Sequence, residues 1–106
     1  MESFKQIDIH QAKELFQVGN AIIVDIRDSS SYRAGHIAKA VLVNDENLDE
    51  FLKNTTKDNP VVCYCYHGFS SQNAAVFFKE NGFKDIYSIE GGFEAWRQVY
   101  PFVNGS

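Results

Sequence analysis

Two cysteines, Cys63 and Cys65, are the side chains of this 106-residue sequence best suited to nucleophilic chemistry. Cys65 ends an apolar run, a short loop containing Gly68 follows, and a helical pattern then begins at Ser70. A cysteine between the end of a strand and the start of a helix meets free backbone N–H groups and the positive end of the helix dipole. In such places the pKa of a cysteine falls from about 8.5 into a range of about 3.5–7.5. The spacing therefore predicts a reactive thiolate at Cys65.

The loop after Cys65 is expected to hold an anion. We expect its backbone N–H groups to face the sulfur, and Gly68 to allow a tight curl because glycine tolerates positive φ. Ser70 and Ser71 are expected to cap the following helix and to donate hydroxyl hydrogen bonds toward the sulfur. We therefore predict that Cys65 is catalytic and that substrate is bound by the six residues after it, which are Tyr66, His67, Gly68, Phe69, Ser70 and Ser71.

Cys63 lies inside the same strand with no loop behind it. We expect a buried, inert thiol there, since free cysteine is among the most buried residue types; a resolving thiol is the alternative. Two cysteines at i and i+2 of a strand are poorly placed for a disulfide. The N-terminal residues lack the basic and then apolar pattern of a secretory signal. Reduced thiols in the cytoplasm are therefore predicted.

Composition narrows the classes of partner. The chain has 14 acidic and 10 basic residues, a formal net charge of −4, and no basic run or zinc-ligand spacing. This balance predicts no nucleic-acid partner. No apolar run approaches the roughly 20 residues that span a bilayer, so no membrane association is expected.

Short apolar runs alternate with helical patterns along the whole chain, which is typical of βαβ units. We expect residues 1–106 to form a single α/β domain of three layers, with a mainly parallel five-stranded sheet and helices on both faces. Strands are predicted at Ile7 and Ile9 and over 21–26, 40–43, 61–65 and 86–89, with 61–65 central. Helices are predicted over 10–18, 28–32, 70–81 and from 92 through 96, and another, capped by Asn44 or Asp45, through Leu52.

Other residue types suited to chemistry have simpler explanations. Asp25 and Arg27 share a strand face, so we expect an ion pair that fixes the end of the sheet. His36 is expected to be a hydrogen-bonding loop residue. Phe93 and Trp96 are three residues apart, which suits a helix face packed on the sheet.

Four segments resemble the single-domain rhodaneses, in the family's order and over nearly the whole chain. They are Val24-Asp25-Ile26-Arg27-Asp28, Gly35-His36-Ile37 with Ala40, the segment from Cys65 to Ser71, and Gly91-Gly92-Phe93-Glu94-Ala95-Trp96. The similarity is greatest to the GlpE type of thiosulfate sulfurtransferase. It implies the rhodanese fold, a Cys65 persulfide formed from thiosulfate with release of sulfite, and transfer of that sulfur to a thiophilic acceptor. Cyanide or a dithiol protein such as thioredoxin would accept it, and no metal or organic cofactor is implied.

Two features of the loop bear on the alternatives. Phosphatases of a related fold have an arginine after the cysteine and five further residues, because a guanidinium clamps phosphate. In this sequence that position is Ser71, which disfavours a phosphatase. His67 is the only side chain of the loop that could carry a positive charge and so attract thiosulfate, and Phe69 is a bulky side chain at the rim of the loop. A persulfide carrier or interaction module fed by a protein donor is therefore the alternative function. A catalytically dead regulatory domain is a third, which the presence of Cys65 disfavours.

Overall fold

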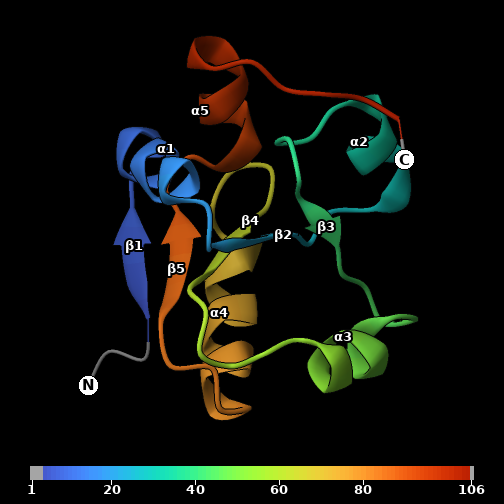
Figure 1. Cartoon of the computed structure of the whole chain (residues 1–106). Helices are drawn as coiled ribbons and strands as arrows, with labels where there is room; N and C mark the ends of the chain where they lie inside the picture. The colour runs from blue at the N-terminus through green and yellow to red at the C-terminus, as the bar shows by residue number, and fades with distance from the viewer. Residues whose placement is uncertain (1–3, 106) are drawn as a thin grey trace.

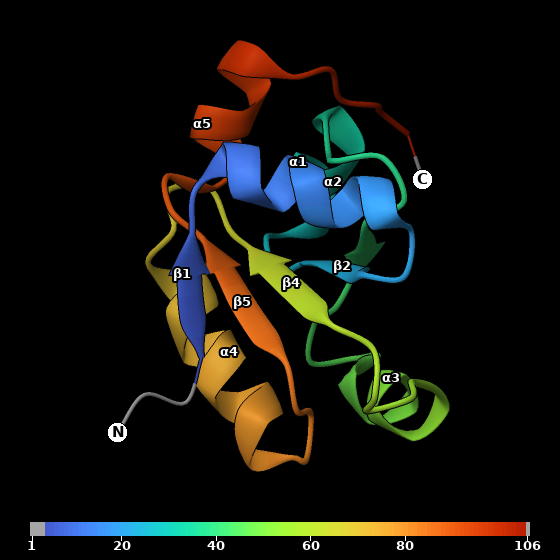
Figure 2. The same ribbon diagram turned by 60° about the vertical axis from the view of Figure 1, so that its left-hand side comes forward.

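The computed structural model describes residues 4–105 and contains one parallel sheet. Its strand order is β1-β5-β4-β2-β3, and every neighbouring pair runs parallel (Figure 2). The central strand is β4, as predicted, and β1 lies at an edge. The strands are β1 (Lys5–Ile7), β2 (Ile22–Asp25), β3 (Val41–Leu42), β4 (Val61–Tyr64) and β5 (Ile86–Ile89).

Helices cover both faces of this sheet, so the predicted three-layer α/β fold is confirmed (Figure 1). One face carries α1 and α5, and the other carries α3 and α4. Between residues 4 and 105, no helix is long and apolar enough to cross a bilayer. The helices are α1 (Ile9–Val18), α2 (Ser29–Ala34), α3 (Leu48–Asn54), α4 (Ser70–Glu80) and α5 (Gly92–Val99).

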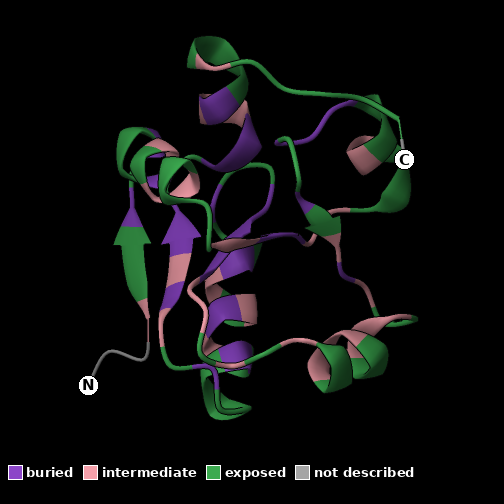
Figure 3. Ribbon diagram, viewed as in Figure 1, coloured by how far each residue is buried: buried purple, intermediate pink, exposed green. Residues whose placement is uncertain are grey.

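Strand β4 separates two apolar clusters because its side chains alternate between the faces of the sheet. Val62 and Tyr64 pack with residues of α1 and α5, whereas Val61 and Cys63 pack with residues of α3 and α4. All four side chains are buried, as expected of a strand covered on both sides (Figure 3). Cys65, two residues after Cys63, is expected by the same alternation to face α4.

Two local predictions were wrong at the ends of helices. Ile9 is the first residue of α1, not part of the first strand, because Asp8 and Gln11 form a reciprocal capping box that starts the helix there. The residue before α3 is Asn47, whereas Asn44 accepts hydrogen bonds from the N–H groups of Glu46 and Asn47 in the preceding turn. Several residues before each helix have side chains that can cap it, and the local turn geometry determines where the helix begins.

The ion pair predicted at the end of β2 is present and buried. Arg27 Nη2 lies 2.7 Å from Asp25 Oδ2 and also donates to the carbonyl of Gly35 at 2.6 Å. The guanidinium packs 4.4 Å from the centre of the Phe93 ring. His36 is, as predicted, a loop residue that makes a hydrogen bond, since its Nδ1 lies 2.6 Å from the carbonyl oxygen of Tyr32. Its side chain is also buried. These contacts connect the segments that follow β2 and α2 to α5, near the carboxyl ends of the strands.

Candidate active site

Cys65 lies immediately after the last residue of β4, at the carboxyl edge of the sheet. Strand alternation directs its side chain to the same face as Cys63, the face that α4 covers. The side chain is buried, with 6% of its surface exposed. Ligand sites of open α/β sheets lie at this edge. The fold therefore brings the sulfur to the N-terminus of α4.

Three polar groups contact the sulfur of Cys65. The backbone N–H of Gly68 donates to Sγ at 3.1 Å and that of Ser71 at 3.3 Å. The Ser71 hydroxyl oxygen lies 3.5 Å from Sγ. A thiolate has no proton to give, so toward a thiolate the Ser71 hydroxyl acts as the donor. The expected N–H donors are present at Gly68 and Ser71. Of the two serine hydroxyls predicted to donate toward the sulfur, that of Ser71 does and that of Ser70 does not.

The two serines were also predicted to cap α4, and this was wrong. The residue before the helix is Phe69, and no side chain caps the helix N-terminus. Ser71 is instead fully buried. Its side chain turns inward because a buried hydroxyl needs partners, which it finds in Cys65 and in β5.

These contacts set the ionisation of the thiol. Burial alone would raise the pKa of Cys65. The side-chain and backbone hydrogen bonds of Ser71, with those of the Gly68 and Ser70 backbone, outweigh burial and lower the pKa below the ordinary value of a cysteine. The side chain is thus poised to react as a thiolate.

Gly68 has the positive φ that the sequence predicted, +93°. A Cβ atom there would lie 2.9 Å from the backbone nitrogen of Gly91 and 3.0 Å from the carbonyl oxygen of Ile89. Glycine is therefore required both by the backbone conformation and by the close approach of the segment after β5. The curl in turn aims the Gly68 N–H at the sulfur.

Helix α5 holds the other side of the loop. The N–H of Phe93 donates to the carbonyl of Cys65 at 2.8 Å, and the N–H of Glu94 donates to that of Tyr66 at 3.0 Å. A side chain on Gly92 would collide with these same two carbonyls. The Tyr66 hydroxyl donates to a Glu94 carboxylate oxygen at 2.6 Å. The loop is thus held by α4 on one side and by α5 on the other, although only a packing role was predicted for α5.

The remaining loop side chains point outward. Tyr66 is 42% exposed and its ring packs edge-on against His67. Phe69 is 75% exposed at the start of α4. Within the loop of residues 65–71, His67 is the only side chain that can become a cation. The next Lys or Arg along the chain is Lys79, near the far end of α4, and its amine donates to the carbonyl of Lys84. The immediate surroundings of the sulfur therefore offer neutral donors.

Ser88 on β5 is a contact of the site that the sequence analysis missed. It pairs with Cys63 across the sheet and faces α4, where its hydroxyl oxygen lies 2.8 Å from that of Ser71. Both side chains are fully buried. The available signal was a lone serine in the apolar run of β5, since a buried hydroxyl must find a partner.

Cys63 is fully buried, as predicted. Burial, together with the nearby Cys65, raises the pKa of this thiol far above its ordinary value. The two cysteines are not bonded to each other. Cys63 is therefore held as a neutral thiol in the core beneath α4.

Comparisons with known proteins agree with this architecture. A thiosulfate sulfurtransferase GlpE of Shewanella oneidensis is 46% identical over 93% of this chain and 98% of its own. The Pseudomonas fluorescens protein of the same name is 46% identical over 95% and 92% of the two chains. The solution structure of a rhodanese-like domain from Anabaena superposes with a TM-score of 0.83 at 28% identity, covering 98% of this chain and 80% of that one.

The family model for the rhodanese-like domain matches residues 8–99. That range contains all four segments on which the resemblance to rhodaneses was based. With relatives above 40% identity over nearly the whole chain, the resemblance is confirmed. The chain belongs to the rhodanese-like domain family.

Proposed function

We propose that the protein is a thiosulfate sulfurtransferase in which Cys65 carries the transferred sulfur as a persulfide. The observation that carries the proposal is the pair of N–H donors, from Gly68 and Ser71, aimed at a cysteine sulfur whose pKa is lowered. The names of the GlpE relatives support thiosulfate as the donor. We also propose that residues 1–106 act as one domain. The two free cysteines suit a reducing compartment, and we propose the cytoplasm.

The proposed reaction has two displacements. The Cys65 thiolate attacks the outer sulfur of thiosulfate, the sulfur–sulfur bond breaks, and sulfite leaves with the bonding electrons. The persulfide that remains is an anion, and preorganised N–H groups stabilise such charge without reorganising. A thiophilic acceptor then attacks the terminal sulfur and returns the Cys65 thiolate. With cyanide the product is thiocyanate.

We propose a dithiol protein such as thioredoxin as the acceptor in the cell. One of its thiolates takes the sulfur from Cys65, and the second then displaces it as hydrosulfide, leaving a disulfide. The exposed Phe69 and Tyr66 at the rim of the loop give such a protein an apolar surface to contact. Release of hydrosulfide from loaded protein on addition of reduced thioredoxin tests this step.

The persulfide is tested by intact mass. Reduced protein incubated with thiosulfate is expected to gain the mass of one sulfur atom and to lose it on addition of cyanide. Cys65→Ser protein is expected to gain nothing, and Cys63→Ala, the matched control, to load like the wild type. Loading of Cys65→Ser, or failure of Cys63→Ala to load, contradicts the assignment of the sulfur to Cys65.

A second function, a persulfide carrier fed by a protein donor, is favoured by the absence of Lys and Arg from the loop of residues 65–71 and by Phe69. Steady-state kinetics separate the two. The proposed enzyme is expected to have a KM for thiosulfate of about 1 mM or below, the usual range for a working substrate. A KM far above that value, with Cys65 still rapidly alkylated, favours the carrier.

A further inference from the structure

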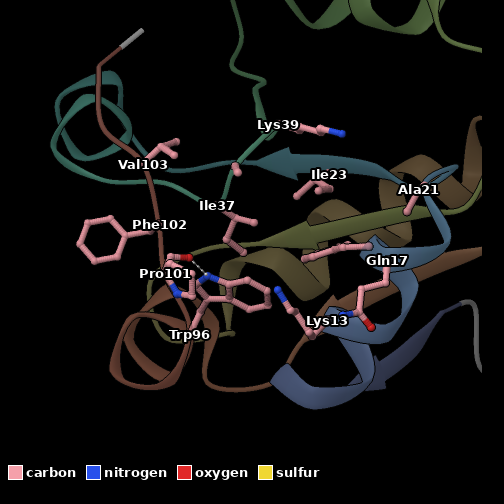
Figure 4. A pocket seen from close by; sticks show the side chains of 13 residues that line it. Lys13, Gln17, Ala21, Ile23, Ile37, Lys39, Trp96, Pro101, Phe102 and Val103 are labelled. Carbon is pink, nitrogen blue, oxygen red and sulfur yellow. Dashed lines mark hydrogen bonds between the residues drawn. The ribbon is translucent and has the colours of Figure 1, made fainter.

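A cavity of about 420 Å³ lies on the α1 and α5 face of the sheet, and no residue of the Cys65 loop lines it (Figure 4). It is bounded by α1, by the segment 37–39 and by the C-terminal segment 101–103. Small-molecule sites in proteins have volumes of about 300–1,000 Å³. The cavity is therefore large enough for a ligand, and it is separate from the proposed sulfur chemistry.

The C-terminal wall of the cavity is held in place by the rest of the fold. The indole N–H of Trp96 donates to the carbonyl of Pro101 at 3.0 Å. The backbones of His36 and Val103 exchange two hydrogen bonds of 2.8 and 2.9 Å. Between them, the Phe102 ring packs edge-on against that of Phe93. Three consecutive residues of this wall, 101–103, are thus anchored by contacts with Trp96, Phe93 and His36.

The lining combines an apolar surface with positive charge. Ile23, Ile37 and Trp96 are buried side chains that line it. Lys13 and Lys39 are its only charged residues, so no carboxylate lines it, although the chain as a whole has a net charge of −4. Charge of one sign in a concave apolar setting favours a ligand of the opposite sign. The complementary ligand has an apolar body and an anionic head.

The two lysines lie on opposite sides of the cavity. Lys13 of α1 lies beside Trp96, and Lys39 lies beyond Ile37 (Figure 4). Lys39 has φ of 72°, and it is the only residue other than glycine with positive φ in the described part of the chain. Glycine would adopt this conformation without strain, whereas a residue with a side chain is disfavoured there. The chain therefore turns at Lys39, in the segment 37–39 that lines the cavity.

We propose that this cavity binds a small organic anion with an apolar body, of the class of medium-chain carboxylates. The hydrocarbon lies along the exposed apolar wall of Phe102 and Val103, above the buried Ile37 and Trp96. The carboxylate lies at one side of the cavity, beside Lys13 or Lys39. This site is additional to the proposed sulfurtransferase site. It requires neither Cys65 nor thiosulfate.

The protein carries its own probe for this site, because Trp96 is the only tryptophan of the sequence and lines the cavity. We expect octanoate to change Trp96 fluorescence saturably, with a Kd in the millimolar range or tighter, the scale that ligand efficiency allows for so small a molecule. Octanol and octylamine have the same chain with a neutral or a cationic head. They are expected to bind more weakly, octylamine most weakly.

Charge-removing variants test the two lysines. Of Lys13→Gln and Lys39→Gln, the substitution that removes the carboxylate's partner is expected to weaken octanoate about 2- to 5-fold, as loss of a partly exposed ion pair does. Both are expected to leave octanol binding unchanged. Lys53→Gln on α3 is the matched control and is expected to bind octanoate like the wild type. Cys65→Ser is also expected to bind normally, so this test is independent of the sulfur chemistry.

Three results would overturn the proposal. The first is no saturable change in Trp96 fluorescence with octanoate. The second is equal binding of octanoate, octanol and octylamine, which means that the head charge is not recognised. The third is an octanoate affinity that neither lysine substitution alters, which means that the anion does not lie beside either lysine.

Discussion

The hydroxyl oxygens of Ser71 and Ser88 lie 2.8 Å apart, and both side chains are fully buried behind the sulfur of Cys65. A hydroxyl carries one proton and can accept others. When Ser88 donates to Ser71, the proton of Ser71 is free to point at Cys65, whose Sγ lies 3.5 Å away. A residue on β5 thereby sets the direction in which a donor on α4 acts.

Ser71→Ala is expected to raise the pKa of Cys65, because it removes a side-chain hydrogen bond that lowers this pKa. At a pH below the native pKa of Cys65, sulfur transfer is expected to fall about 10-fold, as loss of one hydrogen bond to a charged group implies. Alkylation of Cys65 by iodoacetamide, measured as a function of pH, reports the shift directly. Ser88→Ala should move the midpoint in the same direction by less. A midpoint that stays fixed in both variants excludes the hydroxyl pair from the activation of the thiol.

Cys63→Ala is expected to retain full sulfur transfer and to lower the free energy of unfolding. Cys63 is fully buried among the residues packed against α4, so truncation leaves a small cavity that costs about 1–2 kcal/mol. Urea unfolding measures the stability, and thiocyanate formation measures the transfer. Loss of transfer from a folded variant shows that Cys63 takes part in the reaction.

The stability of the protein should depend on pH through Cys65. The pKa of this thiol is lowered in the fold, so the native state releases its proton at a lower pH than the unfolded chain does. The stabilisation is absent below the native pKa, grows as the pH rises, and is complete above the unfolded value of about 8.5. The difference in unfolding free energy between the wild type and Cys65→Ala should rise over this window. A difference that is constant with pH contradicts a stabilised thiolate.

Arg27→Met is expected to destabilise the protein by about 3–5 kcal/mol, because it leaves the fully buried Asp25 carboxylate without its partner. Urea unfolding measures the loss. Lys84→Ala is the control, since its ion pair with Asp58 is exposed and worth at most about 1 kcal/mol. Equal losses in the two variants contradict the structural role of the buried pair.

The position of Cys65 could be predicted from sequence because its determinants are local. An apolar run that ends at a cysteine, a glycine three residues later and a helical pattern after it are enough to place the thiol at a strand end beside a helix. The positive φ of Gly68 follows from the same local pattern. The buried pair of Asp25 and Arg27 could likewise be predicted from their alternation on one strand.

The failures arise where distant segments decide the outcome, except at Ile9, where a neighbouring capping residue decides it. Ser71 looks like a helix cap in the sequence, but Ser88, seventeen residues further along, provides a buried partner that turns its hydroxyl inward. Ile9 continues an apolar alternation, but the capping box of Asp8 starts the helix instead. Residues 101–103, which form one wall of the cavity lined by Lys13 and Lys39, show no hydrophobic periodicity in the sequence. Their position depends on contacts with Trp96 and His36.

The protonated, fully buried Cys63 has a consequence for the life of a loaded protein. Many thiol enzymes discharge a sulfur adduct through a second cysteine of the same chain, and here the only other cysteine is neutral and enclosed. In the proposed reaction, a persulfide on Cys65 would therefore not be discharged by a second cysteine of the chain. Its lifetime would be set by encounters with an acceptor, and the protein would act as a reservoir of one sulfur atom that other molecules empty.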